Sequence, residues 1–156
     1  MGLQENIRNE QVRKLELREP ICISPNVLLR DAVAQMRERN LGSVIVVDEG
    51  RKPLGMFTES MLVEMLSHGT VPLDDAVEKH MAGRCPWVRT DDPIADVLEA
   101  MQLKNIRMLC VVDEQNRVVG LTGQRGLMEY VAKHFPGEVT VQRIGQPNYL
   151  SDREGA

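Results

Sequence analysis

The strongest constraint on this chain of 156 residues is an internal repeat with a spacing of 65 residues. The run VIVVDEGRKPLG at 44–55 returns as LCVVDEQNRVVG at 109–120. The same spacing relates further identical pairs: Asp31 and Asp96, Met36 and Met101, Leu62 and Leu127. A gapless register over this distance indicates two structurally equivalent units. Further upstream, Pro20 aligns better with Pro86, which predicts a slip of one residue there.

Each copy has the same order of expected elements. An extended piece after a proline leads into a helix, then a buried strand, a polar turn, a second strand and a last helix. The buried strands, at 43–48 and 108–113, are continuously apolar and rich in Val, as strands covered on both faces are. The first helix is expected near 29–39 in one copy, and Asp92-Pro93 offers an N-cap and a first-turn proline in the other. Each unit therefore reads β-α-β-β-α in a mixed α/β (α+β) fold.

One unit of about 60 residues buries too little surface to be comfortably stable alone, so two units are expected to share a core. The chain divides into an N-terminal helical segment, a first unit, a helical connector, a second unit and a C-terminal tail, at 1–19, 20–69, 70–85, 86–134 and 135–156. The connector run LDDAVEKHM has a counterpart in EQVRKLEL before the first unit. In the tail, the alternation of VTVQRI predicts either an added edge strand or disorder.

Composition excludes several classes of function. A net charge of −4 provides no general attraction to nucleic acid or anionic membranes, and the apolar runs are too short to span a bilayer. The charged N-terminus does not look like a signal peptide, so we expect a cytoplasmic protein with no nucleic-acid or membrane partner. Cys22, Cys85 and Cys110 lack CxxC spacing and are expected to be reduced, buried thiols, with no metal site. No P-loop or nucleophile–base set is evident, so we expect no enzymatic activity.

The run PICISP from Pro20, followed by a helix, SVIVVD from Ser43 and GMFT from Gly55, resembles a CBS domain, named from cystathionine beta-synthase. The run IRMLCVVD from Ile106, followed by Gly120, resembles a second one. The resemblance covers residues 12–134 and implies two units related by a pseudo-two-fold axis, with two clefts between them. It implies a regulatory module that senses AMP, ADP, ATP or S-adenosylmethionine, forms a homodimer, requires no cofactor and acts in trans on an unknown protein partner. The alternative is a ligand-free scaffold for dimerisation or protein interaction.

In this family the ligand contacts come from the extended piece, the start of the buried strand, and a Thr/Ser-x-x-Asp motif whose Asp holds the ribose hydroxyls. Carried over by position, the candidate ligand-binding residues are Ile21, Ile23, Ser43, Val44, Thr58, Met61, Trp87, Val88, Arg107, Met108, Leu109, Gly123, Arg125 and Gly126. Met61 and Gly126 stand where the two ribose aspartates would be. Their absence favours the scaffold, whereas Trp87 and the turn containing Arg125 favour a ligand.

Several of these residues also have ordinary structural explanations. Thr58 opens a helix and is suited to N-capping it, and Met61 is suited to core packing. Arg125 lies between two glycines at a helix N-terminus, where anions are favoured, or is a solvated charge. Arg107 either borders the cleft or precedes a strand as an exposed residue, and Trp87 either stacks on a base or fills the core.

Overall fold

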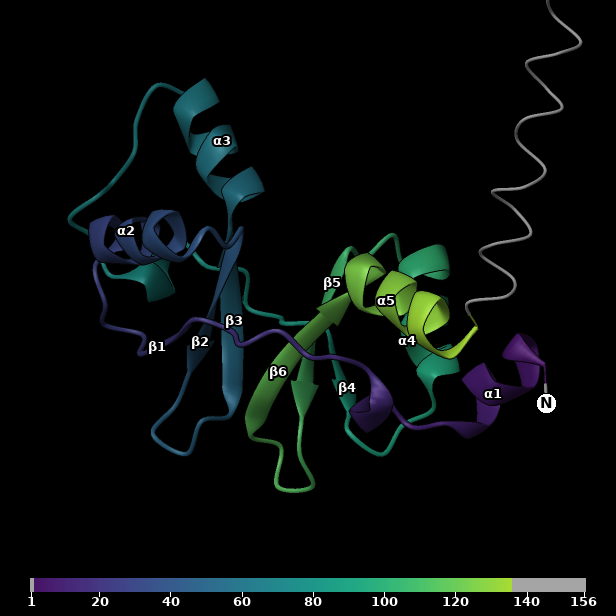
Figure 1. Ribbon diagram of the computed structural model, residues 1–156. Helices are drawn as coiled ribbons and strands as arrows, with labels where there is room; N and C mark the ends of the chain where they lie inside the picture. Colours follow the sequence, from purple (N-terminus) through teal and green to yellow (C-terminus); the bar gives the residue numbers. More distant parts are fainter. Residues whose placement is uncertain (1, 136–156) are drawn as a thin grey trace, which may run out of the picture.

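The computed structural model describes residues 2–135, and it confirms two β-α-β-β-α units. The first unit contains β1 (Cys22–Ile23), α2 (Leu29–Arg39), β2 (Ser43–Val47), β3 (Pro53–Thr58) and α3 (Glu59–Ser67). The second contains β4 (Trp87–Arg89), α4 (Ile94–Leu103), β5 (Met108–Val112), β6 (Val118–Gly123) and α5 (Gln124–His134). Figure 1 shows the two units side by side, with their sheets adjacent. The tail from 136 onward, including the predicted edge strand, lies outside the described residues.

Both sheets have the same topology and register. The strand orders are β1-β2-β3 and β4-β5-β6, with the first pair parallel and the second antiparallel in each sheet. Cys22 lies opposite Ile45, and Trp87 lies opposite Cys110. The spacing of 65 residues therefore continues into the first strands, and the slip predicted from the two prolines is wrong. Just before these strands the spacing is 64, because Arg18 pairs with Leu121 and Ala82 with Met56, so the loop that leads into β4 is one residue longer than the one that leads into β1.

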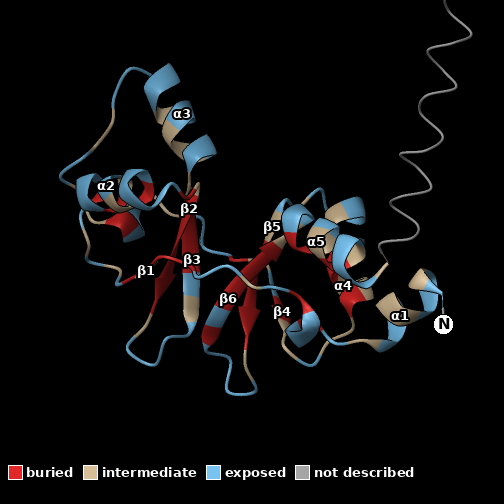
Figure 2. Ribbon diagram, viewed as in Figure 1, coloured by how far each residue is buried: buried red, intermediate tan, exposed pale blue. Residues whose placement is uncertain are grey.

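The molecule has one apolar core in each unit and a third between the two sheets. The buried residues of the third core are Ile45, Val47, Met56, Cys85, Cys110, Val112, Val118 and Leu121. Figure 2 shows buried residues concentrated on the strands, while the helices are exposed on their outer faces. Each sheet thus buries one face under its own helices and the other against the second sheet, which explains the continuously apolar strands. Burial raises the pKa of the Cys22 thiol. The pKa of the Cys110 thiol is raised by a hydrogen bond between Cys110 and Cys85 and by burial.

The segments that precede the two units are exchanged between them. The N-terminal helix α1 (Leu3–Asn9) and the 3₁₀ turn η1 (Val12–Lys14) pack on the second unit, whose core contains Val12. The turn η2 (Val77–Lys79) of the connector packs on the first unit, whose core contains Val77. In Figure 1 the purple N-terminal segment starts beside the second unit, passes its β6 and enters the first unit at β1. The two units are therefore interlocked as well as stacked.

Two local predictions are wrong, one for the connector and one for the start of α4. The connector predicted as a helix at 73–81 forms only the short turn η2, because Val77 N–H donates to Val27 O across 2.8 Å. The helix α4 begins at Ile94 with Pro93 as its N-cap. The Asp92 carboxylate does not cap this helix but accepts a hydrogen bond of 2.8 Å from the backbone N–H of Arg89.

Repeated glycines mark the points at which the exchanged segments cross the sheets. A Cβ at Gly120 would lie 2.8 Å from the Cβ of Leu17, in the N-terminal segment. A Cβ at the equivalent Gly55 would overlap the carbonyl oxygen of Ala82, in the connector. Side chains at these positions would push the crossing backbone away from the strand, so each copy of the repeat requires a glycine there.

Candidate functional site

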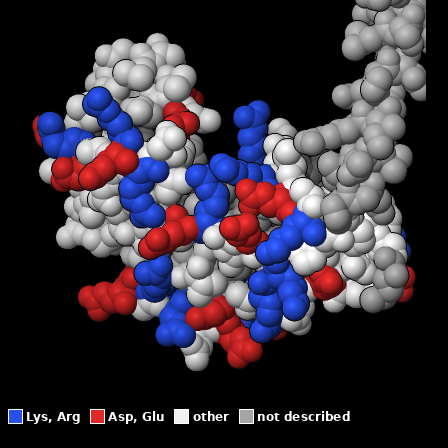
Figure 3. Space-filling view, viewed as in Figure 1, with Lys and Arg blue, Asp and Glu red and all other residues white. Residues whose placement is uncertain are grey.

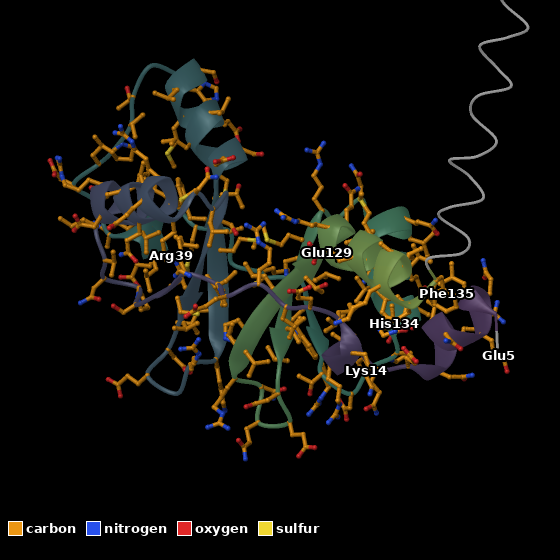
Figure 4. All side chains as sticks on the ribbon, in the orientation of Figure 1. Glu5, Lys14, Arg39, Glu129, His134 and Phe135 are labelled. Carbon is orange, nitrogen blue, oxygen red and sulfur yellow. The ribbon has the colours of Figure 1, made fainter. Side chains whose placement is uncertain are left out.

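A cleft of about 480 Å³ lies between the second unit and the N-terminal segment. Its walls are residues 16–18, 107–108 and 121–126, together with Glu129, and we call it the second cleft. It reaches the junction of the two units, where the Ser43 hydroxyl lies 3.9 Å from the sulfur of Met108. Figure 4 labels Glu129 beside α5, above the space between the units.

Strand pairing brings the two sides of this cleft together. Met108 at the start of β5 pairs with Gly123 at the end of β6, so Arg107 lies next to the first turn of α5. A Cβ at Gly123 would approach the carbonyl oxygen of Arg107 to 2.6 Å. This contact explains why glycine occupies the threonine position of the family motif in the second unit. Gly126 is buried in the first turn of α5, and a Cβ there would lie 2.8 Å from Thr122 Oγ1.

The second cleft carries three arginines and two glutamates. Within residues 2–135, Arg18 and Arg107 are exposed and form no ion pair. Arg125 Nε lies 3.3 Å from Glu129 Oε1, but the arginine side chain is 74% exposed. Such a pair is weak in water and leaves the guanidinium free to reorient. Glu16 is the second acidic group in the wall. The charge of the cleft is therefore positive although the chain is acidic.

The hydroxyl groups of Tyr130 and Thr122, both near the cleft, differ in their hydrogen bonding. The Tyr130 hydroxyl of α5 donates a hydrogen bond to the Glu10 carboxylate and thereby ties the helix to the N-terminal segment. Burial, supported by this hydrogen bond, raises the pKa of Tyr130 to about 12. Thr122 is only 3% exposed, and its hydroxyl has no hydrogen-bond partner among the described residues.

The positions of the first unit that correspond in sequence to the wall of the second cleft are 42–43, 57–61 and 64, and we refer to this region as the first cleft. There Thr58 Oγ1 accepts a hydrogen bond of 3.4 Å from Met61 N–H, so Thr58 is the N-cap of α3, one of the two roles considered for it. The Glu59 side chain lies against Gly42, where a Cβ would be 3.2 Å from its carboxylate oxygen. Phe57 is fully buried at the position equivalent to Thr122. This region thus presents a carboxylate where the second cleft presents donors.

The structure brings together only some of the residues proposed from the sequence. Arg107, Met108, Gly123, Arg125 and Gly126 line the second cleft. Ile21, Ile23, Val44, Val88 and Leu109 are core residues, exposed by at most 6%. Ser43 is also buried, and Met61 packs against the first core. None of these seven residues lines the second cleft, and their contact with a ligand stays a prediction.

Trp87 lies outside the second cleft. Its side chain is 51% exposed, so it does not fill the core, which corrects one of the two roles considered for it. It borders a separate hollow with Pro53 and Leu54 of the first unit and Lys104 of the second. In the first unit the residue equivalent to Lys104 is Arg39, whose guanidinium donates to the Glu19 and Pro20 carbonyls at 3.4 Å.

Sequence reasoning missed the part of the cleft wall that comes from the N-terminal segment, residues 16–18, and it also missed Thr122 and Glu129. The sequence does contain a signal for the contribution of residues 16–18. The similarity of EQVRKLEL to the connector, combined with a glycine repeated at Gly55 and Gly120, indicates a segment that crosses each sheet closely. Nothing in the sequence indicates that the Thr122 hydroxyl has no partner among residues 2–135.

Features of metal-binding, membrane-spanning and nucleic-acid-binding proteins were sought among the described residues. Across residues 2–135, no cluster of three or more His, Cys, Asp or Glu is arranged to hold a metal ion. In the same range, no helix has the length and apolar character needed to cross a membrane. Figure 3 shows that acidic and basic side chains alternate over the visible face, which therefore presents no continuous basic surface.

Known proteins with similar sequences or similar folds were found for this chain. An uncharacterised 17.7 kDa protein of Acidianus ambivalens is 28% identical over 137 residues, covering 88% of this chain and 79% of that protein. An uncharacterised protein of Methanopyrus kandleri is 26% identical over 124 residues, and this chain spans 63% of its length. Among solved structures, the CBS domain protein PAE2072 from Pyrobaculum aerophilum, complexed with AMP, has a TM-score of 0.68 and 20% identity, covering 76% of this chain and 90% of that one.

The CBS domain pair of protein MJ0100, in complex with 5′-methylthioadenosine and S-adenosyl-L-methionine, also has a TM-score of 0.68, with 22% identity, covering 80% of this chain and 98% of that one. At this level of identity, both structures establish the fold. The CBS domain family model matches the chain twice, over residues 12–68 and 75–133. These matches span both units and include the turns η1 and η2 of the exchanged segments, and the chain belongs to the CBS domain family as a tandem pair.

Proposed function

We propose that this protein is a regulatory module that binds an adenosyl ligand in the second cleft and acts on a partner in trans. The observation that carries the proposal is the second cleft itself, in which the start of β5, the first turn of α5 and the exchanged N-terminal segment converge. Solved CBS pairs of the same fold hold AMP, 5′-methylthioadenosine or S-adenosyl-L-methionine. A ligand held by segments of different origin would couple binding to the relative position of the two units.

The direct test is native mass spectrometry combined with thermal melting of the full chain. AMP, ADP, ATP, S-adenosylmethionine and 5′-methylthioadenosine are added separately at millimolar concentration. Binding to the folded state raises the melting temperature by mass action, by about 2.7 kcal/mol of stability at one hundred times the dissociation constant. A rise with at least one adenosyl compound, and none with guanosine or cytidine nucleotides, supports the proposal. No rise with any of the five, for protein shown to be folded, would refute it.

We further propose a homodimer formed through the last helices of the two units. Val63 on α3 and Met128 on α5 occupy equivalent positions and are 62% and 71% exposed. Every residue of α3 is at least partly exposed, including the apolar Leu66. Equivalent apolar positions on the two units allow α3 of one chain to meet α5 of another twice, as a two-fold interface requires. Light scattering should give twice the mass of the 17.6 kDa chain, and Val63→Asp should give the monomer.

The second candidate function is a ligand-free scaffold, and the absence of both ribose aspartates favours it, since Met61 and Gly126 occupy those positions. It predicts the same dimer but no ligand response in the melting test. Both candidates are non-catalytic. Incubation of stoichiometric protein with ATP should therefore give no hydrolysis that a single substitution in the second cleft abolishes.

A further inference from the structure

The hollow beside Trp87 is separate from both clefts. Its volume is about 820 Å³. We call it the Trp87 hollow, and its wall consists of residues 53–54, 83–87, 100, 104, 106 and 109. None of these residues lines the second cleft or belongs to the first. Pro53 and Leu54 come from β3 of the first unit, whereas the other residues come from the connector and the second unit. The hollow therefore lies across the junction of the two units.

The repeat is broken at this hollow. In the first unit, the Arg39 guanidinium donates to the carbonyls of residues 19 and 20 and so ties α2 to the chain before β1. Its equivalent, Lys104, has an exposed side chain that lines the hollow. Trp87 occupies the place of Cys22, since the two residues pair with equivalent residues of β5 and β2. The second unit thus has a large aromatic side chain and an open hollow where the first has a thiol and a bridged arginine.

The wall of the Trp87 hollow presents apolar surface to solvent. Trp87 is 51% exposed and Leu54 is 40% exposed, and Ala100 and Ile106 are partly exposed. Because burial of apolar surface stabilises a fold, a half-exposed indole leaves part of that stabilisation unused. Apolar side chains that are exposed together mark interaction sites more often than scattered ones do. Tryptophan is also among the residue types most enriched at the energetic centres of protein interfaces.

The charged groups of the hollow are all cationic. Arg84 and Lys104 are exposed, and neither forms an ion pair within residues 2–135. The wall contains no Asp or Glu, although the chain carries a net charge of −4. Two cations beside apolar surface complement a segment that carries carboxylates next to an apolar side chain. A nucleic acid strand is matched less well, because following its backbone requires more than two cations.

We propose that the Trp87 hollow is the docking surface for an acidic segment of a partner protein. An aliphatic or aromatic side chain of that segment packs on Trp87 and Leu54, and its carboxylates lie beside Arg84 and Lys104. This inference rests on the proposed action on a partner in trans and specifies where the partner is met. Because Leu54 belongs to the first unit and Trp87 to the second, the docked segment contacts both units. A change in their relative position would then alter the affinity for the partner, which is the coupling that regulation requires.

Peptide display tests the chemistry of the occupant. A library of random peptides is selected on the full chain and counter-selected on Trp87→Ala. The selected peptides should be enriched in Asp and Glu next to Leu, Phe or Tyr. Absence of any peptide that depends on Trp87, or enrichment of basic peptides, would overturn the proposal.

Variants of the hollow then test each part of the surface, with a fluorescently labelled selected peptide followed by polarisation. Trp87→Ala should weaken the peptide at least about tenfold, and Trp87→Phe should restore part of the affinity. Arg84→Glu with Lys104→Glu should weaken it about tenfold and abolish its dependence on salt. The matched control is Arg37→Glu with Lys133→Glu, which reverses two exposed charges outside the hollow and should leave the affinity unchanged. Equal losses in the two double variants, for protein shown by melting to be folded, would overturn the part assigned to Arg84 and Lys104.

Trp87 is the only tryptophan of the chain, so its emission reports on the hollow alone. The selected peptide should shift this emission to shorter wavelength, because apolar contact replaces water. Oligothymidine, AMP and a synthetic peptide of residues 136–156 are added in the same assay. A larger shift with any of these three would assign the hollow to a nucleic acid, a small ligand or the tail of this chain, and would overturn the proposal.

The docking surface and the adenosyl module can fail separately. Acidic-peptide binding that depends on Trp87, without a melting response to any of the five adenosyl compounds, would support the docking surface and the scaffold. A melting response without such peptide binding would leave the adenosyl module and overturn the docking surface. Absence of both responses in folded protein would overturn both.

Discussion

The first and second clefts occupy equivalent places in two units that share strand register, crossing glycines and exchanged segments. In the first cleft a capped helix begins with Glu59, and in the second an uncapped helix begins beside Arg107 and Arg125. The apolar positions of the buried strands match between the copies, while the polar positions at the clefts differ, apart from Glu64 and Glu129. The comparison shows that a duplicated fold can keep its architecture through the strands and specialise one site through a few residues at the helix N-termini.

The two last helices also differ in how they are covered. In the second unit, Tyr130 is buried and its hydroxyl donates to Glu10, so α5 is tied to the N-terminal segment. The equivalent residue of α3 is Met65, which is only partly buried, and the equivalent of Glu10 is Asp75. Asp75 pairs instead with His80, across 2.8 Å, within the connector. The second cleft therefore lies on the more firmly anchored helix, which suits a binding site that must hold its geometry.

The largest expected effect comes from the crossing glycines. Gly55→Ala would drive a methyl group into the Ala82 carbonyl, which is backbone and cannot rotate away, so we expect a loss of about 3–4 kcal/mol in unfolding free energy. Gly120→Ala meets the side chain of Leu17 instead and should cost about 1–3 kcal/mol. Urea unfolding monitored by circular dichroism measures both variants.

Gly83→Ala is the matched control, because a Cβ there meets no atom within 4 Å in the described part of the chain. It should change the unfolding free energy by less than about 0.5 kcal/mol. Equal stability of all three variants would mean that the exchanged segments do not cross the sheets as closely as in the structure. A larger loss at Gly120 than at Gly55 would reverse the comparison between the two units.

The fold could be predicted from the sequence because the repeat and the apolar strands fix it together. The bounds of α2 (Leu29–Arg39) agree with the predicted helix near 29–39, since they are set by local patterning. The prediction of a helical connector was wrong because the backbone of this segment bonds to the first unit, as the Val77 N–H does to the Val27 carbonyl. Such tertiary pairing is invisible to local propensity.

The site was less predictable. Family positions led to Arg107 and to the first turn of α5, but they also led to Ile21, Ile23 and Val44, whose side chains are buried. Arg18 was missed because its place depends on the exchange of the N-terminal segment between units. The charge difference between the clefts follows from the repeat alignment, whereas only the structure shows that the Thr122 hydroxyl has no partner within residues 2–135.

The comparison of clefts can be sharpened by exchanging their charges. Gly42→Arg with Glu59→Gln gives the first cleft the residues of the second, and we expect a second, weaker AMP site, seen as a change in stoichiometry from one to two. Arg107→Gly with Gln124→Glu makes the opposite exchange and should weaken AMP by about tenfold to a hundredfold, since each tenfold step is about 1.4 kcal/mol. Unchanged stoichiometry and affinity in both variants would show that these residues do not decide binding.

The anchoring of α5 can be tested with Tyr130→Phe. Losing a hydrogen bond to a carboxylate should cost about 1.5–3 kcal/mol, less whatever Glu10 regains from water. The pKa of Tyr130 is raised to about 12 in the folded state. Its contribution to stability is therefore fully present below the ordinary tyrosine pKa of about 10, and it is lost as the pH rises from there toward 12. The wild type should lose stability over this range more steeply than the variant, and parallel pH profiles would contradict the assignment.

The smallest effect concerns the helix caps. Thr58→Ala removes the hydroxyl that accepts from Met61 N–H and should cost about 1 kcal/mol, within the usual range for an N-cap. Ser60→Ala, in the same exposed first turn of α3, is the control and should cost less. Hydrogen exchange of the first-turn amides should accelerate in Thr58→Ala alone. Because α5 lacks such a cap, addition of AMP should slow exchange of its first-turn amides while leaving those of α3 unchanged. Protection of α3 instead would place the ligand in the first cleft and invert the comparison.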